Sequence, residues 1–183
     1  MTPPDEAYAA LLRGIAPSGK NMSNAHLRGV FEGLGFERVS SVLASGNILF
    51  RAPAQDVPGL EASIEEALRS RLGIGGGTII RTLGEMQGLL DRDPFAGLTH
   101  GPGTYLTATF LKAPLDVEPP TDDPHPLTRI IDYDAAARAV LAVTDNSVPG
   151  TTGNWMAWLE KTHGRDITTR TWLTVQRIVA KLA

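Results

Sequence analysis

Hydrophobic residues follow two different periods along the first 82 residues. Tyr8–Leu12 is apolar on both faces, which predicts a buried strand. Apolar residues then recur at helical spacing, at Leu27, Val30, Phe31 and Leu34. Ser23 is a suitable N-cap for this helix, and Gly35 stands where a left-handed C-terminal cap is expected. The pattern therefore predicts a strand, a loop from Arg13 to Lys20, and a helix.

The next segments predict a hairpin, a helix and a strand. Arg38–Leu43 and Asn47–Phe50 are two strand-like runs joined by the short turn Ala44-Ser45-Gly46, which favours antiparallel pairing. A helix is predicted over Asp56–Leu72 with Gly73 as its stop, followed by a short strand at Thr78–Arg81. Residues 1–82 thus read β-α-β-β-α-β, the order of a ferredoxin-like unit.

Residues 83–183 predict a second, smaller α+β unit that packs on the first or continues it as one domain. Strands are expected at Tyr105–Leu111, Arg129–Tyr133 and Arg138–Val143, and helices at Asn154–His163 and Thr171–Leu182. The proline-rich and acidic segment Ala113–Pro126 is expected to be a loop. The element types of the first half recur imperfectly in the second half. The predicted fold class is α+β, with a C-terminal helix.

Composition narrows the range of functions. The chain has no cysteine, which excludes disulfides, thiolate metal sites and cysteine nucleophiles. The histidines show no metal-ligand spacing, so no metal and no cofactor is assigned. The net charge of −3 disfavours a protein whose whole surface binds nucleic acid. No basic and apolar leader opens the sequence, and no apolar run is long enough to cross a membrane, so a cytoplasmic location is expected.

The loop after the first strand carries the most distinctive motif. Gly14 and Gly19-Lys20 match the spacing of a phosphate-binding loop up to the last position, where Asn21 replaces Ser or Thr. Asn21 has no hydroxyl for Mg²⁺, Pro17 removes one N–H, and a hairpin follows where a nucleotide triphosphatase needs a parallel sheet. These features count against a working nucleotide triphosphatase and favour two other interpretations: a loop that binds an anion without hydrolysing nucleotides, and a tight strand–helix connection whose glycines serve the backbone.

Other polar residues are candidates for the same site. Arg13 ends an apolar strand, so it is expected to meet either a protein carboxylate or a ligand. Arg170 is expected at the N-terminus of the last helix, where a cation opposes the helix dipole and needs an anion. Ser45 and Asn47 flank the hairpin turn, where turn chemistry alone explains them or their side chains bind a ligand.

Four stretches, in this order, resemble a bacterial family known as domain of unknown function 1697. They are Ala10–Ile15, Gly19–Asn21, Ser45–Phe50 and Thr168–Val175. The resemblance covers nearly the whole chain and implies a ferredoxin-like first half, a related second half and no known reaction. The sequence departs from the family pattern at Ala16, Pro17 and Ser18 in the loop, at Ser41–Ala44 before the hairpin turn, and at Thr171. These departures put in doubt any chemistry that depends on the polar groups they replace.

The sequence predicts a protein that binds a small phosphate- or carboxylate-bearing ligand. The predicted anion site consists of Arg13, Lys20, Asn21, Ser45, Asn47 and Arg170. It requires the hairpin turn and the last helix to approach the first loop. The alternatives are a nucleic-acid-binding module, which needs exposed aromatic residues on a sheet face, and an interaction or oligomerisation domain whose motifs serve only the fold. No catalytic base stands out, so the sequence assigns no reaction, no ligand identity and no oligomeric state.

Overall fold

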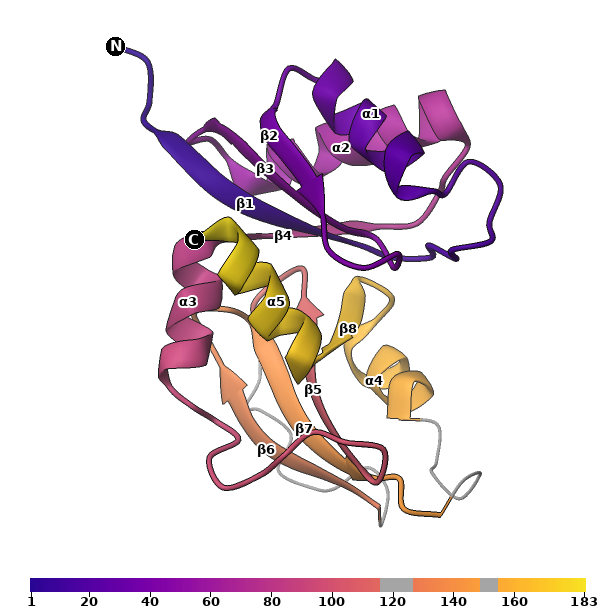
Figure 1. The fold of residues 1–183 in the computed structure, drawn as a ribbon, viewed down its shortest axis with the longest axis vertical. Helices are drawn as coiled ribbons and strands as arrows, with labels where there is room; N and C mark the ends of the chain where they lie inside the picture. The colour runs from indigo at the N-terminus through magenta and orange to yellow at the C-terminus, as the bar shows by residue number, and fades with distance from the viewer. Residues whose placement is uncertain (116–126, 149–154) are drawn as a thin grey trace. The chain divides into compact units, whose positions relative to one another are not determined.

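The chain divides into two compact units, each built around a four-stranded antiparallel sheet (Figure 1). The structure is a computed structural model and describes residues 1–115, 127–148 and 155–183. The first unit comprises residues 1–84 and 177–183, and the second unit comprises residues 85–176. The predicted α+β fold class is confirmed. Most of the proline-rich segment expected to form a loop, Ala113–Pro126, lies outside the described residues.

The first unit has the predicted ferredoxin-like order of elements. They are β1 (Asp5–Leu12), α1 (Asn24–Gly33), β2 (Glu37–Ser41), β3 (Asn47–Pro53), α2 (Val57–Leu72) and β4 (Thr78–Thr82). The strands lie in the order β2-β3-β1-β4, and every neighbouring pair is antiparallel. Both helices cover the same face of this sheet (Figure 1).

Local signals fix where the two helices begin and end. Ser23 is the N-cap of α1 and accepts a hydrogen bond from the backbone N–H of His26. Asp56 is the N-cap of α2, and Gly73 ends that helix in the left-handed conformation. Between sheet and helices lies an apolar core in which the aromatic rings of Tyr8 and Phe36 stack on Phe50 and the ring of Phe31 packs against it at a tilt.

The second unit contains β5 (Thr104–Leu111), β6 (Thr128–Asp134), β7 (Ala139–Asp145), α4 (Trp155–His163) and β8 (Ile167–Thr171). Its strands lie in the order β6-β7-β5-β8, again antiparallel. The boundary between the two units falls inside two helices. They are α3 (Leu83–Asp91), divided after Gly84, and α5 (Trp172–Leu182), divided after Gln176.

The second sheet repeats the first one at the level of single hydrogen bonds. At the end of β1, the N–H of Leu12 donates to Gly46 O at 2.8 Å; at the end of β5, the N–H of Leu111 donates to Arg138 O at 2.8 Å. The residue that follows each of these strands donates its N–H to the residue that precedes the neighbouring edge strand. Arg13 donates to Gly77 O before β4, and Lys112 donates to Asp166 O before β8. The imperfect recurrence seen in the sequence is therefore a structural repeat in which β1–β4 correspond to β5–β8.

Candidate functional site

Three chain segments meet at the C-terminal end of β1. They are the loop Gly14–Asn21, the turn between β2 and β3, and the glycine run Gly75–Gly77. The N–H of Leu12 binds Gly46 in the turn, and the N–H of Arg13 binds Gly77 at 2.9 Å. The sequence prediction that the hairpin turn approaches the first loop is confirmed by this pairing.

Glycine is required at two of these contacts. Gly46 has a φ of +84°, and a Cβ there would lie 2.8 Å from Cγ1 of Ile15 and 3.0 Å from Cβ of Leu12. A Cβ on Gly76 would lie 1.9 Å from the carbonyl oxygen of Arg13, which is closer than any real contact. The loop can therefore pack against both neighbouring segments only because these positions lack side chains.

The loop itself closes through two short turns. The N–H of Gly19 donates to Ala16 O at 2.8 Å, and the N–H of Met22 donates to Gly19 O at 3.2 Å. Asn21 adopts a left-handed conformation with a φ of 59°. Several other backbone N–H groups of the loop make no hydrogen bond within the described residues. They belong to Gly14, Ile15, Ser18, Lys20 and Asn21.

The two cations predicted for this site differ in exposure. Arg13 is half-buried at the strand end, whereas Lys20 is exposed near the tip of the loop. No carboxylate of the described residues forms an ion pair with Lys20. Lys20 is therefore available to a ligand.

Ser45 and Asn47 lie side by side, but Asn47 has a structural role. Asn47 is the first residue of β3 and is fully buried. Its side-chain Nδ2 donates to Val42 O at 3.0 Å and to Oγ of Ser45 at 3.2 Å, which holds the turn closed. The amide group of Asn47 thus serves the turn, and of these two residues only Ser45 is exposed.

Arg170 directly precedes Thr171, whose hydroxyl group accepts from the N–H of Thr174 in the first turn of α5, but it belongs to a strand that was not predicted. It is the fourth residue of β8 and pairs with Ala108 of β5, while α5 begins two residues later at Trp172. The threonines around it favour a strand. Burial lowers the pKa of Arg170 to about 10, and its Nη1 donates to Oγ1 of Thr168 at 2.7 Å.

Arg81 is a buried cation that the sequence interpretation missed. It pairs with Ala9 of β1 and has no exposed surface. In the structural repeat Arg81 is the counterpart of Arg170. Thr78 pairs with Leu12 and Ile167 pairs with Leu111, and each arginine lies three residues further along its strand. The signal was present in the sequence, since an Arg-Thr pair precedes the helix in both halves.

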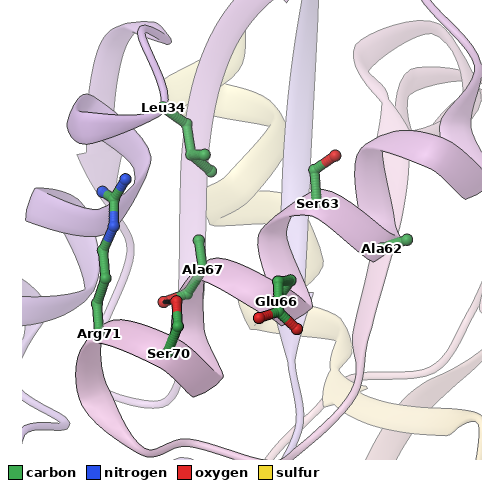
Figure 2. A pocket seen from close by; sticks show the side chains of 7 residues that line it. All are labelled: Leu34, Ala62, Ser63, Glu66, Ala67, Ser70 and Arg71. Carbon is green, nitrogen blue, oxygen red and sulfur yellow. Dashed lines mark hydrogen bonds between the residues drawn. The ribbon is translucent and has the colours of Figure 1, made fainter.

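A groove of about 530 Å³ runs along the outer side of α2 (Figure 2). Its lining is mostly small or polar, at Leu34, Ala62, Ser63, Glu66, Ala67, Ser70 and Arg71. Nη1 of Arg71 donates to Val30 O at 3.4 Å, near the C-terminal end of α1. The side chain of Glu66 pairs with Arg69. The charges of this groove thus have local partners and offer no concentrated site for an anion.

Two further features are absent from the described parts of the chain. No three His, Asp or Glu side chains there lie close enough together to hold a metal ion. None of the helices in residues 1–115, 127–148 and 155–183 combines the length and apolar character needed to span a bilayer.

Comparison with known proteins agrees with the fold. A solved structure, "The structure of conserved bacterial protein SP0830 from Streptococcus pneumoniae", matches with a TM-score of 0.66 and 20% identity, over 98% of this chain and 100% of that chain. No curated protein matches the sequence. A family model described as "Protein of unknown function (DUF1697)" matches residues 6–126. Because that match covers more than half of the chain, the protein belongs to the DUF1697 family.

Proposed function

We propose that the protein binds a small ligand bearing a phosphate or carboxylate group at the loop Gly14–Asn21. The observation that carries the proposal is the set of five loop N–H groups without a hydrogen-bond partner in the described residues. Backbone N–H groups in a glycine-containing turn converge readily on an anion. The site is built from the first unit alone, with Arg13 and Lys20 as its cations and Ser45 at its rim.

The local charge favours an anion. No Asp or Glu occurs between Glu6 and Glu32, while Arg13, Lys20 and Arg28 all lie in that stretch. The loop leads directly into α1, whose first turn contains no acidic residue. The partial positive charge at that helix terminus is therefore not offset by a side chain of the first turn.

The ligand is bound without the machinery of a nucleotide triphosphatase. Both neighbours of β1 in the sheet, β3 and β4, are antiparallel to it. A nucleotide triphosphatase places its metal-binding aspartate on a strand parallel to the one before the loop. Asn21 also lacks the hydroxyl group that would contact Mg²⁺. We therefore assign recognition of an anionic group and no hydrolysis.

The aromatic residues of the first unit do not favour the nucleic-acid alternative. Phe50 lies on β3 of the first sheet, and only 1% of it is exposed. It packs against Tyr8 at a ring distance of 5.4 Å and against Phe36 at 4.6 Å, inside the core. Base recognition needs aromatic faces that a nucleobase can reach.

Thermal denaturation against a panel of nucleotides, sugar phosphates and carboxylates tests the proposal. A ligand at about 100 times its Kd should add roughly 2.7 kcal/mol to the unfolding free energy of the wild type. We expect Lys20→Ala to lose most of that gain and to keep its stability without ligand. Lys161→Ala, which removes an exposed lysine from α4, serves as the matched control. Equal ligand-induced shifts in wild type and Lys20→Ala would contradict the proposal.

A further inference from the structure

A second cationic pocket lies in the first unit, between the strands β2 and β3 and the last turn of α5. It is small and partly enclosed, with a volume of about 120 Å³. Its lining comprises Arg38, Ser40, Leu49, Phe50, Arg51, Lys181, Leu182 and Ala183. Leu49 and Phe50 are buried. Three of the eight lining side chains are therefore cations and none is Asp or Glu, while Ala183 borders the pocket with the backbone carboxylate that ends the chain in this structure.

The cations are not neutralised by the surrounding side chains. Within the described residues, Arg38 and Arg51 form no ion pair and no side-chain hydrogen bond. Lys181 donates only to a carbonyl, the backbone oxygen of Ser41 at 2.8 Å. The nearest acid in the strand ladder is Glu37, directly opposite Arg51, and no ion pair joins the two.

The backbone is strained where it presents Arg38. This residue has a φ of 49°, a conformation that is uncommon for residues other than glycine, asparagine, aspartate and histidine. It lies in the irregular stretch between Glu37 and Ser40, where the register of β2 against β3 shifts. Such bulges redirect side chains and occur often beside functional sites. Because glycine would relieve the strain, the arginine at this position calls for a reason beyond the fold.

The charge of the whole unit points the same way. The first unit has ten Lys and Arg against eight Asp and Glu, a net charge of +2. The second unit has seven against twelve, a net charge of −5. The negative net charge of the chain thus hides a basic first unit, and three of its ten cations line this one pocket.

We infer that the pocket of Arg38, Arg51 and Lys181 binds a single oxyanion group, the phosphate or carboxylate of a small ligand. Two guanidinium groups match the geometry of such an anion, and the ammonium group adds a point charge. The volume of about 120 Å³ is small, which suits a single oxyanion group. This site is separate from the loop Gly14–Asn21 and does not depend on the function proposed for that loop.

The test is a titration of the protein comprising residues 1–183 with inorganic phosphate, followed residue by residue by NMR. Sodium acetate forms a second arm that distinguishes a carboxylate from a phosphate, and sodium chloride at equal ionic strength controls for screening. We expect saturable amide shifts at Arg38, Ser40 and Arg51 with at least one of the two oxyanions. Shifts no larger than those produced by chloride would overturn the inference.

Two variants separate binding from folding. Arg38→Gly removes the cation and relieves the strained φ, so its melting temperature without ligand should equal or exceed that of the wild type. Its affinity for the oxyanion should fall at least tenfold, and Arg51→Gln should cause a similar loss.

The matched control is Arg138→Gly, which replaces an arginine of the second unit that has a φ of 51° and should leave the affinity unchanged. Lys20→Ala should also leave these shifts unchanged. Wild-type affinity in both Arg38→Gly and Arg51→Gln would refute the site.

Discussion

At the scale of single residues, the end of β1 is shaped by how closely backbones approach one another. The carbonyl of Arg13 lies so near Gly76 that a single added carbon atom would overlap it. We expect Gly76→Ala to lower the unfolding free energy by about 2 kcal/mol or more, because backbone has to move to admit the methyl group. The same movement should disturb the loop Gly14–Asn21 and weaken ligand binding there. Chemical denaturation measures the first effect, and the ligand panel measures the second.

The neighbouring residue supplies the control for that substitution. A Cβ on Gly75 would meet nothing within 4 Å, so Gly75→Ala should be neutral or slightly stabilising. Neither Gly75 nor Gly76 has a positive φ. A difference in stability between the two alanine variants therefore reports the close contact with Arg13 and not backbone strain. Equal stability of the two variants would show that the contact with Arg13 is not needed.

Residue-scale features of the site were only partly predictable from the sequence. Lys20 and Asn21 were identified because a local spacing pattern marks them. The roles of Gly46 and Gly76 depend on contacts with Leu12, Ile15 and Arg13 that are distant in sequence, and no local pattern reports such contacts. The sequence left two roles open for Asn47, in the turn or at the rim of a ligand site, and its amide group closes the turn.

At the scale of elements, the sequence predicted helices most accurately where capping residues mark the ends of the helix. Ser23, Asp56 and Gly73 fix the bounds of α1 and α2, and both helices were predicted to within a few residues. The strand β8 was missed because its five residues run into α5 without a turn between them. Its partner β5 lies about sixty residues earlier, and pairing over that distance leaves no local signal.

The C-terminal end of α4 provides a prediction about pH. His163 is the last residue of this helix, and burial lowers its pKa from the ordinary value of 6.5. Near and below pH 6.5 the unfolded chain therefore binds more protons at this residue than the folded chain does. The contribution of neutral His163 to the unfolding free energy is therefore fully present above pH 6.5 and is lost as the pH falls through the lowered pKa.

Replacing that histidine tests the assignment. All three tryptophans belong to the second unit, so tryptophan fluorescence follows its unfolding. The unfolding free energy of His163→Phe should depend less on pH between about pH 5 and 7 than that of the wild type. Identical pH profiles for the two proteins would show that His163 does not contribute to the dependence.

At the scale of the whole molecule, α5 is divided between the two units. Its first five residues, Trp172–Gln176, are counted in the second unit, and Arg177–Leu182 belong to the first. Trp172 packs on Phe95 at a ring distance of 5.0 Å in the second unit. In the first unit Lys181 binds Ser41, and Leu182 lines the pocket above Leu49. One continuous helix is thus divided between the two units along the chain.

Breaking this helix between its two halves should therefore destabilise both units. Gln176 is exposed, so Gln176→Pro leaves the core side chains in place while it removes one helical hydrogen bond and clashes with the preceding turn, at a cost of about 3 kcal/mol or more. Tryptophan fluorescence should report the loss in the second unit, and hydrogen exchange at β1 and β3 should report the loss in the first. Gln176→Ala removes the same side chain without breaking the helix and should retain wild-type protection. Reduced protection confined to the second unit would mean that Arg177–Leu182 adds little to the first.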